Sequence, residues 1–199
     1  MTLYRFGRRL VYIIFKILFR FKVEGHENLD QIPENKGVLL CSNHISNFDP
    51  PLVGAATTRT LSFMAKAELF DVPVLGKLIS RVNAFPIKRG GSDRHALKTA
   101  IDILNSGRTL IMFPEGTRSK TGELKKGLAG VGFLALRTVA IVVPVAIVNG
   151  YHLFKVTRVV FGKPVALEEL KANKAKPQEV ADKIMENIQD ILSTGKKIS

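Results

Sequence analysis

The sequence of 199 residues contains no tryptophan and a single cysteine. One cysteine excludes an internal disulfide, so a chain of this length is expected to fold as one domain around a hydrophobic core. Acidic residues are also scarce, because 17 of them face 30 lysines and arginines and leave a net charge of +13. So basic a chain is expected to bind an anionic partner: nucleic acid, an anionic membrane surface, or a protein or substrate that carries acidic or phosphate groups.

The first 23 residues contain no acidic side chain and six basic ones. On a helical wheel the bases fall on one side, opposite an apolar set made of Leu3, Phe6, Leu10, Ile14, Ile17 and Phe21. The uninterrupted apolar run, residues 10–15, is too short to span a bilayer, and Lys16 and Arg20 interrupt any signal-peptide core. The pattern predicts residues 1–22 as an amphipathic helix in a membrane interface, with a helix packed on its own domain as the alternative.

The remainder, residues 23–199, alternates between strand and helix patterns. Apolar, strand-like segments are centred on residues 37–43, 60–65, 83–87, 108–113 and 140–148, with shorter ones at 21–25 and 155–162. Helical patterns occupy residues 50–57, 73–81, 93–107, 127–138 and 177–192. This alternation predicts the α/β class: a single layered domain with a mostly parallel central sheet, flanked by helices and open to antiparallel strands at its edges.

His44 and Asp49 follow a buried strand and lie five positions apart. Such a pair suits a general base and its orienting carboxylate, since the carboxylate would hold Nδ1–H and leave Nε2 free to take a proton. No G-x-S-x-G serine accompanies them, so the nucleophile would be a hydroxyl of the substrate. The alternative is a loop histidine beside an aspartate that caps a helix.

Two further polar clusters follow predicted strands. Lys88 and Arg89 precede two glycines at a strand-to-helix turn, an arrangement that suits phosphate binding or a solvated basic turn. Glu115 and Arg118 follow the next strand; Arg118 offers a planar fork to a phosphate, and Glu115 would orient it or accept from a hydroxyl. Because ligands bind at strand ends in such sheets, the shared placement of all three clusters predicts one site.

The sequence gives little support to a cysteine nucleophile, a metal site or nucleic-acid binding. Cys41 is a possible nucleophile, although a buried strand cysteine is commoner and alternation places it on the opposite face from His44. His26, His95 and His152 lack the spacing of metal ligands, so no metal is expected. No nucleic-acid-binding motif is present, and aromatic residues for base stacking are few, so nucleic acid is not the expected partner.

With these residues assembled, the sequence resembles the glycerolipid acyltransferase family that acylates lysophosphatidic acid. The first motif of that family, N-H-x-x-x-x-D, is present as residues 43–49, and the third, F-P-E-G-T-R-S, is complete as residues 113–119. The second motif matches residues 85–89 and the fourth matches V-P-V at 143–145. The resemblance covers about residues 22–165, with Leu124 standing where the family often has an aromatic residue.

The resemblance implies transfer of a fatty acyl group from acyl-CoA or acyl carrier protein to the sn-2 hydroxyl of 1-acyl-sn-glycerol-3-phosphate, giving phosphatidic acid for phospholipid biosynthesis without a cofactor or metal. His44 would be the base and Asp49 its orienting partner. The acceptor phosphate and glycerol would be bound by Lys88, Arg89, Glu115, Gly116 and Arg118. The protein would lie peripherally on the cytoplasmic face of the cell membrane, against anionic lipids.

Three alternatives remain open. In the first, the acceptor is glycerol-3-phosphate or another lysophospholipid. In the second, the enzyme is a hydrolase of lipid or thioester bonds. In the third, the chain is an inactive binder of membrane surfaces.

Overall fold

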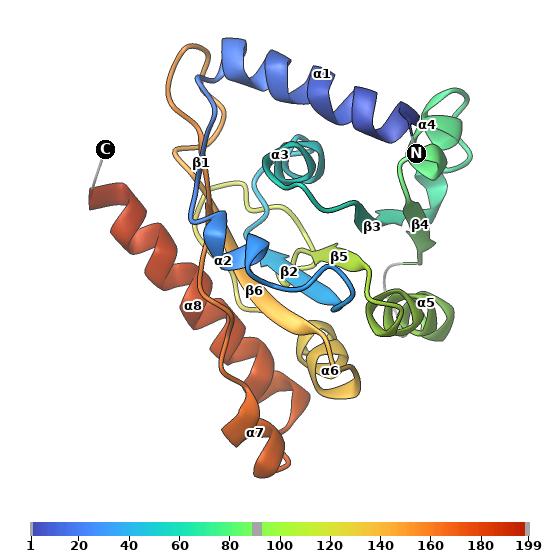
Figure 1. Ribbon diagram of the computed structural model, residues 1–199, viewed down its shortest axis with the longest axis vertical. Coiled ribbons are helices and arrows are strands. Elements are labelled where there is room, and N and C mark those ends of the chain that lie inside the picture. Colours follow the sequence, from blue (N-terminus) through green and yellow to red (C-terminus); the bar gives the residue numbers. More distant parts are fainter. Residues whose placement is uncertain (1, 89–92, 198–199) are drawn as a thin grey trace.

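The computed structural model describes residues 2–88 and 93–197, and these form one seven-stranded sheet with helices on both faces (Figure 1). The strands are β1 (Lys22–Glu24), β2 (Val38–Ser42), β3 (Leu61–Lys66), β4 (Ala84–Ile87), β5 (Thr109–Met112), β6 (Ile141–Val148) and β7 (Arg158–Phe161). The helices are α1 (Thr2–Leu18), α2 (Glu27–Asp30), α3 (Asp49–Ala56), α4 (Leu75–Arg81), α5 (Arg94–Asn105), α6 (Ala129–Arg137), α7 (Glu168–Ala172) and α8 (Pro177–Lys197), with a 3₁₀ turn, η1, at Ala67–Leu69.

The strand order is β1-β7-β6-β2-β5-β3-β4, and the five strands from β6 to β4 run parallel to one another. β7 pairs antiparallel with β6 and parallel with β1, so the last two strands at one edge run the other way. The expected α/β class with a mostly parallel sheet is confirmed, including its antiparallel edge. The three short elements α2, η1 and α7 were not foreseen.

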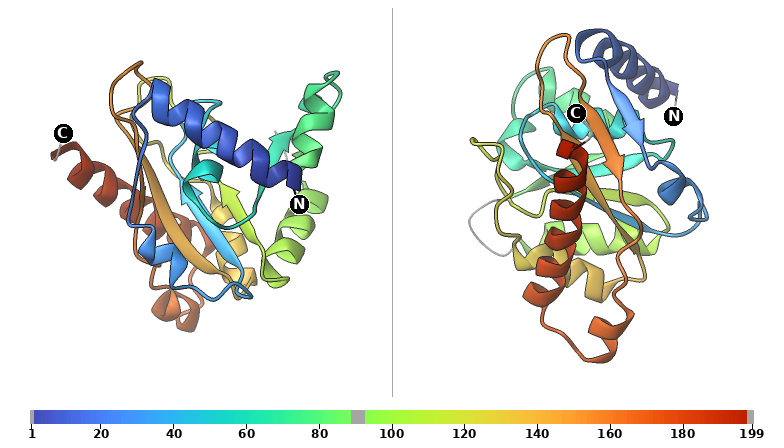
Figure 2. Two further views of the ribbon diagram at one scale, coloured as in Figure 1. Left: turned by 45° about the horizontal axis from the view of Figure 1, so that its top comes forward. Right: turned by 90° about the vertical axis from the view of Figure 1, so that its left-hand side faces the viewer.

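The side chains of β2 alternate between two hydrophobic clusters, as a strand buried on both faces requires. Leu39 and Cys41 pack into the cluster that contains the apolar faces of α5, α6 and α8. Val38 and Leu40 pack into the other cluster, with residues of α1, α2 and α3. In consequence α1 and α8 lie on opposite sides of the sheet, as Figures 1 and 2 show.

The N-terminal end of α5 is fixed by a capping residue. Asp93 directly precedes the helix, and its carboxylate accepts a hydrogen bond from Ala96 N at 3.0 Å. The same carboxylate accepts from Lys88 N at 2.9 Å, so two hydrogen bonds hold the turn before α5. These hydrogen bonds lower the pKa of Asp93, so the cap is fully ionised at neutral pH.

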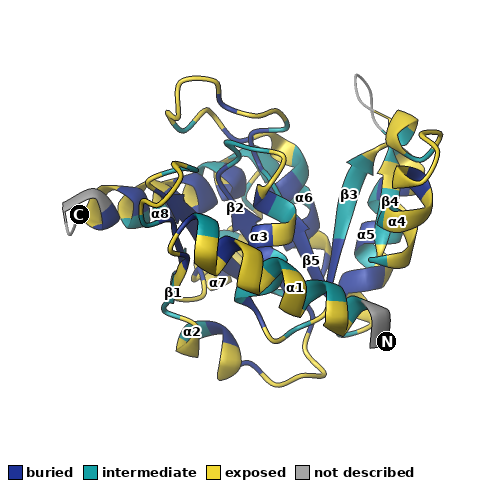
Figure 3. Cartoon of the chain, turned by 90° about the horizontal axis from the view of Figure 1, so that it is seen from above, coloured by how far each residue is buried: buried dark blue, intermediate teal, exposed yellow. Residues whose placement is uncertain are grey.

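The N-terminal helix divides its circumference into three strips. One strip packs onto the domain through Phe15 and the partly buried Val11 and Leu18. A second carries the exposed bases, and a third exposes the apolar side chains of Phe6, Leu10, Ile13, Ile14 and Ile17. Figure 3 shows that much of the outer surface of α1 is exposed. The helix thus packs on its own domain and still presents an apolar strip that the described residues leave uncovered.

Candidate active site

The candidate site lies at the carboxyl ends of the parallel strands, where three loops meet. β2 is hydrogen-bonded to β5 on one side and β6 on the other, so the segments that follow these three strands emerge next to one another. They carry His44 after β2, Glu115 and Arg118 after β5, and Tyr151 after β6. Of the three clusters expected to share one site, those after β2 and β5 are therefore neighbours, whereas Lys88 follows β4, which β3 separates from β5.

Asn43 fixes the start of the loop that carries His44. Its buried side-chain amide donates to Ile147 O at 3.1 Å and accepts from Ile147 N at 2.8 Å. This pair of hydrogen bonds ties the end of β2 to β6 and leaves the amide fully paired. The direction in which the chain leaves the sheet is set before His44 is reached.

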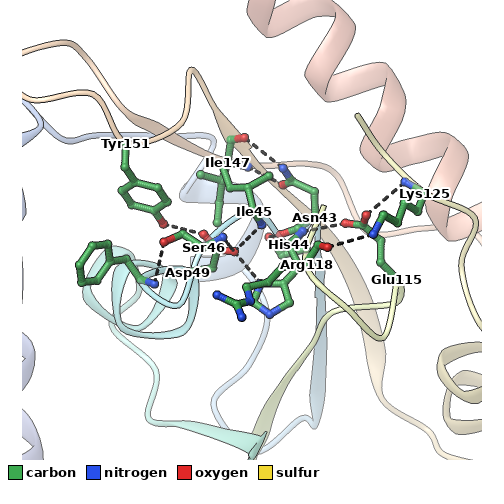
Figure 4. Close-up of polar contacts among 12 residues, drawn as sticks. Asn43, His44, Ile45, Ser46, Asp49, Glu115, Arg118, Lys125, Ile147 and Tyr151 are labelled. Carbon is green, nitrogen blue, oxygen red and sulfur yellow. Dashed lines mark hydrogen bonds and ion pairs between the residues drawn. The ribbon is translucent and has the colours of Figure 1, made fainter. Parts of the chain in front are cut away.

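His44 and Asp49 form the contact that the spacing predicted. The two side chains meet at 2.6 Å between His44 Nδ1 and Asp49 Oδ2 (Figure 4). Asp49 is completely buried at the first turn of α3, whereas the His44 side chain is 12% exposed. Because the carboxylate accepts at Nδ1, the proton of a neutral imidazole lies there, and Nε2 makes no hydrogen bond to any residue in the described parts of the chain.

Asp49 is held by more donors than the imidazole alone. Oδ2 also accepts from the backbone N–H groups of Ile45 at 2.7 Å and Ser46 at 2.8 Å, and Oδ1 accepts from Tyr151 Oη–H at 2.7 Å. Four donors surrounding one buried carboxylate fix its position. The capping role considered as the alternative for Asp49 is not what these contacts show, since Oδ2 is used by the loop that carries the histidine and Oδ1 by Tyr151, and α3 has no side-chain cap.

The imidazole is held on its face as well as at its edge. The rings of His44 and Phe113 are stacked, with centroids 4.1 Å apart and planes inclined by 21°. Phe113 opens the F-P-E-G-T-R-S segment directly after β5. This segment therefore packs against the imidazole of His44.

Glu115 is tied to the backbone of the same loop. Its Oε1 accepts from His44 N at 2.7 Å and its Oε2 accepts from Lys125 N at 3.1 Å, and the residue is only 5% exposed. A further hydrogen bond joins Ser119 N to His44 O at 2.7 Å. Both peptide groups that flank the His44 side chain are thus bonded to the segment after β5. The role of Glu115 toward a substrate stays a prediction.

Arg118 lies on this segment with an exposed side chain. Lys125 Nζ donates to the backbone carbonyl of Arg118 at 2.9 Å, while the Arg118 guanidinium makes no hydrogen bond or ion pair with the described residues. Gly116, two positions earlier, adopts a φ of +68°, the left-handed region that glycine occupies most easily, and so allows the tight turn. The guanidinium is therefore available to an anionic ligand.

The second predicted basic cluster is described only in part. Lys88 follows β4 with an exposed side chain, and its backbone N–H is the group that donates to Asp93. Arg89 lies outside the described residues, so its placement is not addressed. The binding roles of both residues stay predictions.

Cys41 does not reach the site. It is completely buried on the face of the sheet covered by α5, α6 and α8, and burial raises the pKa of its thiol well above the usual range. A neutral, inaccessible thiol is a poor nucleophile. Residues 2–88 and 93–197 contain no group of three potential metal-ligating side chains.

Two contributions were missed from the sequence. Tyr151 is 102 positions from Asp49 and belongs to no recognisable motif, and burial together with the Asp49 charge raises its pKa, so it stays a protonated donor. Lys125 holds Glu115 through its backbone N–H, a group that gives no signal in the sequence. Contacts of this kind depend on which loops become neighbours, which no local spacing reports.

Comparison with known proteins identifies the family and agrees with the fold. The sequence model of the family described as acyltransferase matches residues 20–148. Within that range lie the described site residues from Asn43 to Lys125. The chain belongs to the acyltransferase family.

Two similar proteins with assigned names are 1-acyl-sn-glycerol-3-phosphate acyltransferases. The 1-acyl-sn-glycerol-3-phosphate acyltransferase of Streptococcus pneumoniae is 30% identical over 195 residues, which cover 92% of this chain and 74% of that protein. The chloroplastic 1-acyl-sn-glycerol-3-phosphate acyltransferase LPAT1 of Arabidopsis thaliana is 30% identical over 133 residues, 66% of this chain but only 36% of that protein. The chain therefore spans about a third of the latter and about three-quarters of the former.

A solved structure shares the fold. The crystal structure of the 1-acyl-sn-glycerophosphate acyltransferase PlsC from Thermotoga maritima superposes with a TM-score of 0.72 at 27% sequence identity. The superposition covers 96% of this chain and 78% of that one. The layered α/β architecture predicted from the sequence is thus confirmed by an experimental neighbour.

Proposed function

We propose that this chain transfers a fatty acyl group from acyl-CoA or acyl carrier protein to the sn-2 hydroxyl of 1-acyl-sn-glycerol-3-phosphate, forming phosphatidic acid. The observation that carries the proposal is the 2.6 Å contact between His44 Nδ1 and a fully buried Asp49 at the sheet edge. The names of the relatives from Streptococcus and Thermotoga support this acceptor.

His44 would act as the general base. Asp49 holds the proton on Nδ1, so Nε2 carries the lone pair that takes the hydroxyl proton of the acceptor. The acceptor oxygen then forms a bond to the acyl carbonyl carbon while the carbon–sulfur bond breaks. The proton passes from Nε2 to the leaving thiolate, which becomes the free thiol of the donor, and His44 returns to its starting state. The protein needs to supply no nucleophile.

The acceptor phosphate would be bound by Arg118, Arg89 and Lys88, with Glu115 and Gly116 shaping the turn that presents Arg118. A guanidinium without an internal partner can offer two parallel N–H donors to a phosphate. Holding the phosphate would place the sn-2 hydroxyl next to Nε2, and such positioning contributes to the rate alongside base catalysis.

The segment of residues 1–22, whose helix ends at Leu18 and not at residue 22 as expected, would act as the interface element of the acyltransferase domain formed by residues 23–199. It would hold the protein peripherally on the cytoplasmic face of the membrane. The exposed apolar strip of α1 includes Ile13, 47% exposed, and Ile17, 64% exposed, next to a strip of exposed bases. That combination fits an anionic lipid surface. None of the helices in the described residues has the length and hydropathy to cross a bilayer.

The loop between β6 and β7 extends this surface. Phe154 N donates to Leu18 O at 2.7 Å, which places the loop at the end of α1. Leu153 and Phe154 are 61% and 68% exposed, and the neighbouring Lys155 is exposed as well. The loop would therefore meet the lipid surface together with α1.

Acyl transfer is tested with purified protein, a labelled acyl thioester and either lysophosphatidic acid or glycerol-3-phosphate. We expect thiol release that requires lysophosphatidic acid and yields labelled phosphatidic acid. Thiol release at full rate without any acceptor would identify a hydrolase instead. Release that requires glycerol-3-phosphate would change the acceptor, and no release with any donor or lysolipid would favour a membrane binder without activity.

Membrane association is tested by sedimentation with vesicles that contain phosphatidylglycerol. Replacing Ile13 and Ile17 by serine should weaken binding by at least about tenfold, because two apolar side chains leave the interface. Val139→Ser is the matched control, since Val139 is 78% exposed at the start of β6 and not on α1. Equal binding of all three proteins would contradict the role of α1.

A further inference from the structure

Asp49 presents its two oxygens to very different surroundings. Oδ2 accepts three hydrogen bonds, all from the loop of residues 44–46. Oδ1 has Tyr151 as its one donor among the described residues, at 2.7 Å (Figure 4). The loop alone therefore fixes one end of the carboxylate, and the rotation of the group about its own axis depends on the tyrosine.

Tyr151 is itself held in place by aromatic neighbours. Its ring centroid lies 6.2 Å from that of Phe15 and 5.5 Å from that of Phe19, at the end of α1, and 5.7 Å from that of Phe48. All three pairs meet edge to face, the arrangement that aromatic rings prefer. The hydroxyl is thus aimed at Asp49 by packing that involves three separate segments of the chain.

The hydroxyl is also confined to the role of a donor. Burial and the neighbouring Asp49 charge raise the pKa of Tyr151 well above its ordinary value, so it keeps its proton at every pH at which the enzyme would work. A protonated hydroxyl facing a buried carboxylate oxygen donates and does not accept. It completes the hydrogen bonding of Asp49 without competing for the imidazole.

We propose that Tyr151 is a positioning residue for the proposed acyl transfer: it acts through Asp49, by orienting the carboxylate that holds the His44 imidazole. The proposal rests on the proposed function of the same site. It requires that removal of the hydroxyl impair the chemical step and leave acceptor binding alone, because Tyr151 contacts Asp49 and neither Arg118 nor Lys88.

The first test compares Tyr151→Phe with Tyr4→Phe. The control also deletes a tyrosine hydroxyl with a hydrogen bond, since Tyr4 Oη accepts from Leu61 N at 3.0 Å, but far from Asp49 along the chain. Tyr151→Phe should lower kcat by about ten- to fiftyfold, as expected for a hydrogen bond to a charged group, with the acceptor KM within about twofold of wild type. Tyr4→Phe should change kcat by less than about twofold.

The second test reads the imidazole directly. The Nδ1 proton of His44 should give a downfield signal in proton NMR spectra, since it is held by a carboxylate at 2.6 Å. That signal should move in Tyr151→Phe and stay in place in Tyr4→Phe, at a temperature at which circular dichroism shows both variants folded. This comparison needs no turnover, so it remains informative even if acyl transfer is not the reaction.

The third test is a double-mutant cycle with Asp49→Asn. If Tyr151 acts through Asp49, adding Tyr151→Phe to Asp49→Asn should lower kcat by less than about twofold further. The proposal is overturned if the two effects multiply, if Tyr151→Phe matches Tyr4→Phe in kcat and NMR signal, or if it raises KM with kcat unchanged. Absence of acyl transfer in the wild-type protein would refute the proposed function and leave the NMR result to decide on Tyr151.

Discussion

The candidate site has two sides that the protein treats differently. The base side comprises His44, Asp49, Tyr151 and Glu115, whose side chains are joined to one another or to backbone groups by hydrogen bonds of 2.6–3.1 Å. The anion side, as far as it is described, consists of the exposed side chains of Lys88 and Arg118, which have no hydrogen-bond or ion-pair partner among the described residues.

This difference matches what each side has to do before a substrate arrives. A general base must already carry the right tautomer and orientation, since any reorganisation during the reaction would raise the barrier. An anion-binding arginine gains its partners from the ligand, and an internal carboxylate partner would have to be displaced first. Changes on the base side should therefore lower kcat, and changes on the anion side should raise KM.

The largest effect is expected from His44→Ala. Removing the base should lower kcat by about 10³-fold, within the range that general base catalysis contributes, while circular dichroism shows the fold retained. The measurement is initial rates of thiol release at saturating lysophosphatidic acid. More than about a tenth of the wild-type rate would refute the assignment of His44 as the base and would remove the distinction between the two sides.

Glu115→Gln tests whether a residue from the arginine-bearing motif belongs to the base side. The glutamine side chain has one oxygen, so it can accept from only one of the two N–H groups of His44 and Lys125 and would turn its own NH₂ group toward the other. We expect kcat to fall by about tenfold and the free energy of unfolding to fall by about 1–3 kcal/mol, with little change in the acceptor KM.

Steady-state kinetics and urea denaturation of Glu115→Gln measure both quantities. A tenfold rise in acceptor KM at unchanged kcat and unchanged stability would instead place Glu115 on the anion side, in the substrate-binding role that the motif suggested.

Arg118→Ala should act on binding. Loss of a charge-assisted pair with the acceptor phosphate should raise the KM for lysophosphatidic acid by about tenfold or more with kcat nearly unchanged, and Arg118→Lys should lie between, because lysine keeps the charge but not the fork. Lys120→Ala is the control, since Lys120 is an exposed base two residues away. A lowered kcat at unchanged KM would instead assign Arg118 to the base side and contradict the division of the site into two sides.

How much of the fold could be predicted from the sequence is shown by its two long amphipathic helices. Helical spacing alone places Val180, Ile184 and Ile188 together on α8, and all three are completely buried against the sheet and α6. The same spacing groups Phe6 and Ile17 on α1, yet these side chains are 66% and 64% exposed. Periodicity identifies an apolar face, but whether the domain covers that face depends on tertiary packing, which periodicity does not contain.

The site was predictable where its contacts are local. His44 and Asp49 are five residues apart, and the turn between them lets their side chains meet directly. Tyr151 reaches Asp49 across 102 positions, and Glu115 is bonded to backbone N–H groups that every residue except proline possesses. Neither contact leaves a pattern of residue types, so both required the neighbouring order of β2, β5 and β6 to be known.

Cys41→Ala should give the smallest effect and sets the baseline for both sides. Cys41 lies three residues before His44, but its side chain belongs to the core cluster under α5, α6 and α8, and the raised thiol pKa keeps it protonated at neutral and moderately alkaline pH. We expect kcat and KM within about twofold of wild type and a loss of about 1 kcal/mol of unfolding free energy from the small cavity. N-ethylmaleimide should leave the folded wild-type enzyme active, because neither the thiolate nor a path to it is present. If N-ethylmaleimide rapidly inactivated the wild-type enzyme and Cys41→Ala abolished this inactivation, the thiol would reach the site. The chemistry would then be assigned to a cysteine hydrolase and not to His44 and Asp49.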